Sequence, residues 1–318
     1  MTLPKPRGSL EHAALPPCDP VAPSIRFRHT SETDMPAQIS RALLTKLLSL
    51  AGAALLSGCQ SIRVTEADLL RADRRVEAAV KPDQRIERHR LSTPHGEIAV
   101  TEVTRTGNRI VMLYLGGNQF RTSIEGGDVV ARMPSSVDLV LLDYPGYGDS
   151  SGHPSVDALM GTALAVYDRF LAHETGKRRI VYGTSTGGFV AAHVAGLRQP
   201  ERLVLEGTAP DTRRWLDSMV PWFAKPFVHT ELSPPLSAID SVAALDGYPG
   251  PILMMVGSRD TQTRPALMKK MAAELGRGER LVQFHVIPGR GHGEVLQHSQ
   301  ARALLAAFVD PQSAGDAP

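Results

Sequence analysis

The sequence has few of the residues that mark metal, redox or nucleic-acid proteins. It contains two cysteines, Cys18 and Cys59, and lacks the C-x-x-C and H-E-x-x-H spacings of metal sites. The 35 Lys and Arg residues nearly balance the 33 Asp and Glu residues, and no basic run occurs. This balance gives no reason to expect nucleic acid as a partner. We therefore expect no metal, no cofactor and no nucleic-acid partner.

Nucleotide-binding motifs are also missing. Gly146-Tyr-Gly148 follows an expected strand, but Ser151 replaces the third glycine of the dinucleotide fingerprint, and no G-K-[ST] occurs. The 318 residues, 42% of them hydrophobic, are enough for one large α/β domain. Residues 1–34 are proline-rich without an apolar period, so we expect them to be disordered or a mis-annotated extension.

Residues 35–58 have the features of an export signal. Arg41 and Lys46 precede an uncharged Leu/Ala-rich stretch that is too short to span a bilayer comfortably. The ending Leu56-Ser-Gly-Cys59 resembles the lipobox of bacterial lipoproteins, in which the cysteine thiol is acylated and the chain is cut just before it. The resemblance implies lipidation at Cys59 and a place in the cell envelope. Gln60 after the cysteine favours the outer membrane, facing the periplasm. A buried amphipathic helix ending in Cys59 is the alternative.

Residues 59–94 form the expected anchor, linker and a charged helix from Glu66 to about Val80. Beyond them, short Val/Ile/Leu-rich runs alternate with helical patterns up to about residue 310, and residues 311–318 form a tail. The strands are expected at 97–104, 109–115, 137–143, 179–182, 202–206, 251–257 and 281–287. The helices are expected at 155–173, 187–197, 264–275 and 298–308. This alternation predicts an α/β domain over residues 95–310 with a mostly parallel, doubly wound sheet.

One stretch interrupts the alternation. Residues 211–245 are too long for an ordinary connection and carry several aromatic side chains and prolines. We interpret them as a small lid inserted after the sixth strand, and a longer helix with a proline-broken end is the alternative. Aromatic side chains above the site would bind an apolar substrate group. The residues expected to do so are Trp215, Trp222 and Phe223, with Phe227 nearby.

Gly183-Thr-Ser185-Thr-Gly187-Gly follows an expected strand and opens an expected helix. This matches the G-x-S-x-G nucleophile turn in its strand–turn–helix context. The turn must be so tight that Ser185 takes a strained backbone, and the glycines remove Cβ atoms that would clash. The helix N-terminus also favours negative charge at this point. Ser185 is therefore the predicted nucleophile.

A serine hydroxyl needs a base and an orienting carboxylate to react near neutral pH. Asp260 follows the run 252–256, and His292 lies in the glycine-flanked loop after the last strand. Both positions belong to the carboxyl edge of a parallel sheet, where Ser185 also lies. The order Ser185, Asp260, His292 predicts a catalytic triad. Asp211 is the rival acid, and His285 and His298 are weaker rivals for the base.

A triad of this kind uses two backbone N–H groups to bind the oxyanion. Thr186, directly after the nucleophile, supplies the first. Tyr114-Leu-Gly-Gly-Asn118 ends an earlier strand, and its glycines let the backbone approach the site, so Asn118 is the expected second donor. A simple turn is the alternative for this loop.

Together, Leu115-Gly-Gly-Asn, Asp143-Tyr-Pro-Gly-Tyr-Gly-Asp-Ser-Ser-Gly, Gly183-Thr-Ser-Thr-Gly-Gly, Gly257-Ser-Arg-Asp and Gly291-His resemble the successive motifs of the α/β-hydrolase superfamily. The resemblance covers roughly residues 95–310. The loop after residue 143 is similar to that of a small-lidded branch whose members act on lipids and acylated proteins. Many relatives have His-Gly where this chain has Gly116-Gly117, so the detail of the oxyanion loop differs.

The resemblance implies the fold and the chemistry class but not the substrate. The leading hypothesis is a membrane-anchored serine hydrolase that cleaves a lipid-like or small-molecule carboxylic ester or thioester through an acyl-enzyme. An amidase or peptidase with the same triad, and a catalytically silent binding lipoprotein with this fold, remain as alternatives.

Overall fold

The computed structural model describes residues 60–64, 84–278 and 280–311. The expected extension 1–34, the signal segment 35–58, Cys59, the helix from Glu66 and most of the tail lie outside these residues, so they stay predictions. Among the described residues, no helix combines the length and the apolarity that crossing a membrane requires.

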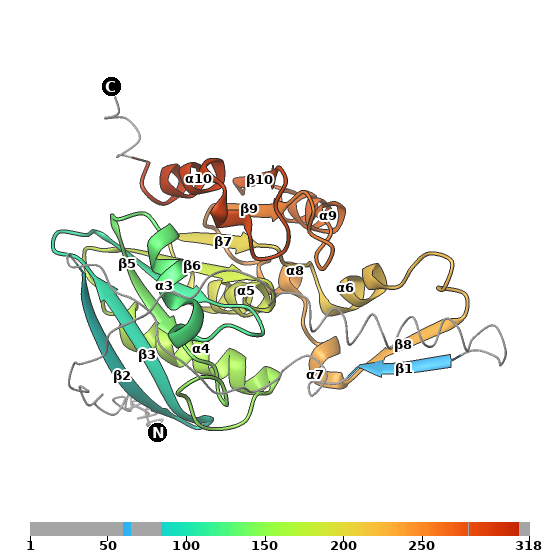
Figure 1. The fold of residues 1–318 in the computed structure, drawn as a ribbon, viewed down its shortest axis with the longest axis horizontal. Coiled ribbons are helices and arrows are strands. Elements are labelled where there is room, and N and C mark those ends of the chain that lie inside the picture. Colours follow the sequence, from blue (N-terminus) through green and yellow to red (C-terminus); the bar gives the residue numbers. More distant parts are fainter. Residues whose placement is uncertain (1–59, 65–83, 279, 312–318) are drawn as a thin grey trace, which may run out of the picture.

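Eight strands form the central sheet in the order β10-β9-β7-β6-β4-β5-β3-β2 (Figure 1). Their bounds are β2 (Arg85–Thr93), β3 (Gly96–Thr104), β4 (Ile110–Leu115), β5 (Val137–Leu142), β6 (Arg178–Thr184), β7 (Arg202–Glu206), β9 (Ile252–Gly257) and β10 (Val282–Ile287). β4, β5, β6, β7, β9 and β10 are parallel, whereas β3 is antiparallel to both β2 and β5. The predicted mostly parallel sheet is therefore confirmed.

Helices cover both faces of this sheet. They are α3 (Thr122–Arg132), α4 (Val156–Phe170), α5 (Thr186–Arg198), α9 (Pro265–Leu275) and α10 (Ser299–Val309), and a short 3-10 helix η1 (Val295–Gln297) precedes α10. Side chains of α4, α5 and α9 share one core with the sheet, and those of α3 and α10 share the other. β4, β5 and β9 are buried along their whole length, as expected for strands covered on both faces.

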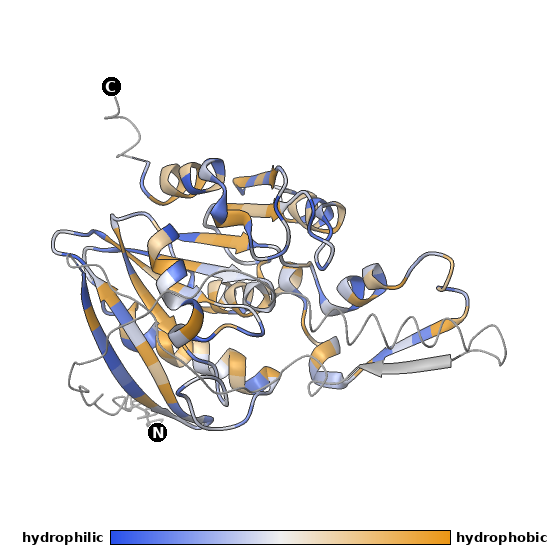
Figure 2. Ribbon diagram, in the orientation of Figure 1, coloured by the Kyte–Doolittle hydropathy of each residue, from blue (hydrophilic) through white to orange (hydrophobic). Residues whose placement is uncertain are grey.

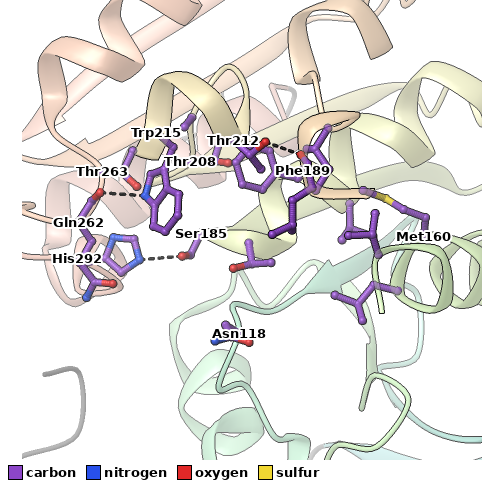
Figure 3. A pocket seen from close by; sticks show the side chains of 17 residues that line it. Asn118, Met160, Ser185, Phe189, Thr208, Thr212, Trp215, Gln262, Thr263 and His292 are labelled. Atoms are coloured by element: carbon purple, nitrogen blue, oxygen red, sulfur yellow. Dashed lines mark hydrogen bonds between the residues drawn. The ribbon is translucent and has the colours of Figure 1, made fainter. Parts of the chain in front are cut away.

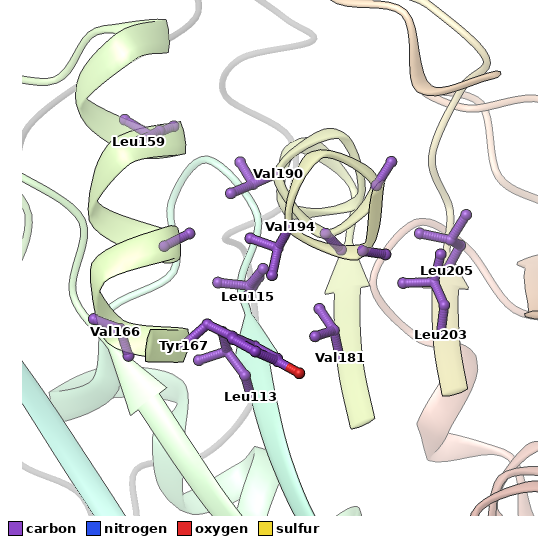
Figure 4. Packing of buried hydrophobic residues seen from close by; sticks show 14 of the residues in the cluster. Leu113, Leu115, Leu159, Val166, Tyr167, Val181, Val190, Val194, Leu203 and Leu205 are labelled. Atoms are coloured by element: carbon purple, nitrogen blue, oxygen red, sulfur yellow. The ribbon is translucent and has the colours of Figure 1, made fainter. Parts of the chain in front are cut away.

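The larger core shows how the apolar runs become structure. Leu113 and Leu115 of β4 and Val181 of β6 point toward Val190 and Val194 of α5 (Figure 4). Alternate strand residues face the same side of the sheet, so this contact follows from the period of two. The interlocked packing fixes α5, and with it the turn that begins α5.

Two elements in or against the central sheet, β2 and α3, are absent from the elements that the sequence predicts. β2 is an edge strand of charged and polar residues, and only one of its nine positions, Leu91, is buried. Charged residues are typical of an edge strand, because they discourage pairing with other chains. Such a strand has no apolar run, so the search for apolar runs did not predict it. α3 is the second element, and it has two buried residues in eleven, Gly126 and Val129.

The segment 211–245, called the lid segment below, follows β7 as expected. It contains α6 (Thr212–Met219), β8 (Val228–Leu232), α7 (Pro234–Ser237) and α8 (Ser241–Ala244). Leu216 and Leu236 form a small core of its own. β8 pairs in parallel with β1 (Gln60–Val64) as a separate two-stranded sheet (Figure 1). The structure is thus a compound insertion and not the longer helix considered as an alternative.

Candidate active site

Ser185 lies in the tight turn between β6 and α5. Its backbone has φ 54° and ψ −121°, a conformation that L-residues rarely adopt. The close approach needs glycine: a Cβ on Gly187 would lie 2.1 Å from the Leu115 carbonyl oxygen, and one on Gly183 would lie 2.4 Å from the Gly187 carbonyl oxygen. The Ser185 N–H donates to the Glu206 carbonyl at 2.8 Å. This is the strained turn that the motif predicts.

His292 and Asp260 meet Ser185 at the carboxyl ends of the strands. The His292 Nε2 atom lies 2.8 Å from Ser185 Oγ, and its Nδ1 atom lies 2.8 Å from Asp260 Oδ2 (Figure 3). The Asp260 side chain is 1% exposed, and its other oxygen accepts the backbone N–H groups of Gln262 and Thr263. A carboxylate held in this way orients the imidazole so that Nε2 faces the hydroxyl.

The rival residues have other positions. Asp211 is the N-cap of α6, where it accepts the Arg214 N–H at 2.6 Å and pairs with the Arg214 guanidinium. His298 caps α10 by accepting the Gln300 N–H, and His285 is a residue of β10. The hydrogen bonds therefore join Ser185 with Asp260 and His292, and the catalytic roles of these three residues stay predictions.

The two expected oxyanion donors border the site. Thr186 is the first residue of α5, so its N–H has no acceptor within the helix. A Cβ on Gly117 would lie 3.3 Å from the Ser185 Cβ, which shows how closely the loop before Asn118 passes the nucleophile. The Asn118 side chain accepts the Tyr147 hydroxyl at 2.8 Å, so it is held by a neighbouring loop. Both residues line the pocket.

The Glu206 side chain is a feature of the site that the sequence patterns do not indicate. It is 3% exposed at the end of β7, and it pairs with the Tyr182 hydroxyl and the Val295 N–H. It therefore ties β6, the strand that leads into Ser185, to the segment that follows His292. Burial raises the pKa of Glu206, against the lowering effects of Tyr182 and His292. Glu206 ends the apolar run of residues 202–206, which predicts a strand and gives no sign of a functional carboxylate.

The pocket beside Ser185 has mostly apolar walls. It encloses about 810 Å³ of empty space including its mouth, and α4, α5, the lid segment and the loop after Asp260 contribute to it (Figure 3). Its apolar lining consists of Val156, Leu159, Met160, Phe189, Val190, Ala209, Trp215, Leu236 and Ile239. Trp215 also donates its indole N–H to the Gln262 carbonyl at 3.1 Å. It therefore fastens the lid segment to the Asp260 loop while it lines the pocket.

The other predicted aromatic residues do not line this pocket. Trp222 is 82% exposed, Phe223 56% and Phe227 51%. The prediction that Trp222 and Phe223 contact the substrate is therefore wrong for this pocket, because neither residue lines it. They follow α6 on a turn that leads away from the pocket, whereas Trp215 lies within α6 and faces the pocket. Aromatic content alone does not indicate on which side of the lid segment a ring lies.

A possible metal-binding group lies outside the site. The Glu87, His89 and Glu102 side chains, on the β2–β3 hairpin, bring their ligand atoms within 4.8 Å of one another. His89 Nε2 lies 2.6 Å from Glu102 Oε2, which is the geometry of an imidazole–carboxylate pair. This contact accounts for the group without an ion.

The chain is similar in sequence to known proteins. A family model described as serine aminopeptidase, S33, matches residues 133–241. An uncharacterized protein of Mycobacterium tuberculosis is 28% identical over 193 residues, which cover 60% of this chain and 66% of that protein. The chain therefore spans just under two thirds of this relative's length.

Two solved structures share the fold over most of the chain. The Pyrococcus furiosus esterase Pf2001 matches with a TM-score of 0.59 at 15% identity, covering 76% of this chain and 98% of that one. The Butyrivibrio proteoclasticus protein Est1E with bound ferulic acid matches with a TM-score of 0.56 at 15% identity, covering 71% and 99%. With the sheet order and the family model, these likenesses support the α/β-hydrolase superfamily and show that the chain has the α/β-hydrolase fold.

The triad assignment predicts a ranking of variants. Ser185→Ala and His292→Ala should each lower kcat for a nitrophenyl ester by about 10⁶-fold, and Asp260→Asn somewhat less. Asp211→Asn should leave kcat unchanged, because Asp211 caps a helix and an asparagine caps almost as well. Circular dichroism checks folding. A larger loss of kcat in Asp211→Asn than in Asp260→Asn would contradict the assignment.

Glu206 predicts a pH dependence of stability. Because its pKa is raised above the ordinary value of 4.5, the unfolded chain releases this proton first, and the free energy of unfolding falls as pH rises from there toward the folded pKa. Between the unfolded-state and folded-state pKa values of Glu206, the free energy of unfolding falls by about 1.4 kcal/mol per pH unit. Glu206→Gln should therefore gain stability relative to wild type as the pH rises above 4.5, measured by urea unfolding at two pH values on either side of it. If the difference in free energy of unfolding between Glu206→Gln and wild type is the same at both pH values, the raised pKa of Glu206 is contradicted.

Proposed function

We propose that the protein is a serine hydrolase that cleaves carboxylic ester or thioester bonds and takes an apolar acyl group. The observation that carries this proposal is an apolar pocket that opens directly onto Ser185 Oγ, beside His292. The esterase structures that share the fold are consistent with it. A binding protein without catalysis would not need a strained serine hydrogen-bonded to an imidazole.

The contacts of Ser185, His292 and Asp260 support the following reaction. His292 Nε2 accepts the Ser185 proton as Oγ attacks the carbonyl carbon, and the Asp260 carboxylate stabilises the imidazolium. The N–H groups of Thr186 and Asn118 bind the oxyanion, aided by the N-terminus of α5. When the tetrahedral intermediate collapses, the bond to the leaving alcohol or thiol breaks, and His292 protonates that group. Water then attacks the acyl-enzyme with His292 as base, the bond between Ser185 Oγ and the acyl carbon breaks, and His292 returns the proton to Oγ as the carboxylic acid leaves.

The composition of the pocket argues against an aminopeptidase. An enzyme of that kind must bind a free ammonium group, which needs a carboxylate or several acceptors in the site. No Asp or Glu is among the 17 described residues that line the pocket, and its polar groups are hydroxyls, amides and His292. We therefore place the apolar acyl group of an ester, and not a peptide amino terminus, in this space.

The pocket also suggests a chain-length preference. Each buried CH₂ contributes about 0.8 kcal/mol, or about fourfold in kcat/KM, until the pocket is full. Met160 lies at the end remote from His292 (Figure 3), so Met160→Trp should shorten the optimal chain. Leu197→Trp adds the same ring at a surface position that is 55% exposed and serves as the control. The measurement is kcat/KM for nitrophenyl esters of increasing length.

In wild type and in the Leu197→Trp control, kcat/KM should rise with chain length to the same optimum. A flat profile in wild type would sink the apolar-acyl proposal. An identical optimum in Met160→Trp, at equal folding by circular dichroism, would show that the chain binds elsewhere. The amide analogue of the best ester separates an esterase from an amidase, since we expect its kcat/KM to be far lower.

We further propose that the mature chain is anchored in the bacterial envelope by acyl chains on Cys59, on the outer membrane facing the periplasm. The charged start, apolar run and lipobox order of residues 35–59 support this. Two or more acyl chains give stable attachment, whereas one gives only marginal binding.

The anchor predicts a processed, lipid-carrying chain. Mass spectrometry of the mature protein should find Cys59 at the amino terminus, heavier by its acyl groups. Cys59→Ser should leave the longer precursor, and Cys18→Ser, which removes the other thiol, should be processed like wild type. An unmodified Cys59 inside a longer mature chain would refute the anchor.

A further inference from the structure

Residues 221–227, called the aromatic turn below, present three large apolar side chains to solvent. Trp222, Phe223 and Phe227 are each more than half exposed, in contrast to the buried core aromatics. Large exposed patches of this kind mark interaction surfaces more often than accidents. None of the three lines the pocket, so substrate contact does not account for their exposure.

The turn holds these rings in a defined arrangement. The Ala224 and Lys225 N–H groups donate to the Pro221 carbonyl, and the Phe227 N–H donates to the Ala224 carbonyl. Ala224 is 8% exposed and fixes the inner side of the turn. The Trp222 and Phe223 rings meet edge to face with their centroids 6.0 Å apart. The rings therefore project outward together from a closed backbone.

We propose that the aromatic turn inserts into the surface of a lipid bilayer. Tryptophan and phenylalanine favour the boundary between headgroups and acyl chains, and the exposed Lys225 between them can meet anionic headgroups. The proposal deepens the anchoring proposed at Cys59 and rests partly on it. The lid segment would then have two functional faces: one carries Trp215 and borders the pocket, and the other carries the aromatic turn and contacts lipid.

The pairing of β1 with β8 favours the bilayer as the occupant of this surface. Gln60 pairs with Val228, and because the strands are parallel, both begin at the outer end of the lid segment (Figure 1). Figure 2 shows that the stretch leading into β8 is hydrophobic at this outer end. The residue before Gln60 is Cys59, and the residue before Val228 is Phe227. An acyl anchor at Cys59 would therefore enter the membrane next to the aromatic turn.

The test uses the fact that the chain has two tryptophans. The full chain carrying Cys59→Ser and Trp215→Phe cannot be acylated and keeps Trp222 as its sole indole. It is mixed with phosphatidylethanolamine/phosphatidylglycerol vesicles whose acyl chains are partly brominated. Trp222 emission should shift to shorter wavelength and be quenched by the bromine. Phe223→Ser and Phe227→Ser should each weaken this partitioning by about tenfold, as expected for one lost ring.

Leu197→Ser, which removes another exposed side chain, is the matched control and should leave the quenching unchanged. Vesicle binding without quenching of Trp222 would overturn the proposal, because the chain would then attach through another segment. A shift of Trp222 emission without lipid that grows with protein concentration would overturn it in favour of a second copy. Acylation of Cys59 and ester hydrolysis are measured separately on the wild type, so failure of the anchor or of the proposed activity is distinguishable from failure of docking.

Discussion

The close packing of β6 against α5 at Ser185 is the constraint on which the rest of the site depends. The backbone of α5 passes so near the end of β4 that a Cβ at Gly187 would overlap the Leu115 carbonyl. This proximity forces the chain through a positive φ at Ser185. Such strain persists only where the surroundings over-determine it. Here they do so through the buried apolar contact of α5 with β4 and β6 and through the Ser185 N–H bond to β7.

Glu206 extends this constraint to the histidine. Its carbonyl accepts the Ser185 N–H, while its side chain bonds Tyr182 of β6 and the Val295 N–H beyond the His292 loop. A carboxyl with such burial is costly when ionised, and the raised pKa expresses that cost. Glu206 thereby connects the turn that carries Ser185 with the segment that follows His292. The positions of Ser185 and His292 therefore depend on Glu206 as well as on Asp260.

The sequence predicted the sheet, and it predicted that Ser185, Asp260 and His292 lie together, because each of these features depends on local signals. Apolar runs mark strands buried on both faces, and Asp260 and His292 follow such runs in the chain. β2 was missed because its charged edge residues obey no burial period, and Glu206 because a polar residue at the end of an apolar strand leaves no signature. Which rings of the lid segment face inward depends on the path of the turn after α6, and composition carries no information on that path.

The two faces of the lid segment have a consequence for substrate access. Trp215 borders the pocket and is tied to the loop that follows Asp260, whereas Trp222 is exposed on the turn that leads into β8, the strand that pairs with β1. If the outer end rests in a bilayer, as we propose, the lid segment contacts the lipid at one end and borders the pocket at the other. An apolar acyl chain held in that bilayer would then be concentrated close to the protein. A substrate that is poorly soluble in water would gain most from this arrangement, because its transfer through water carries the largest hydrophobic penalty.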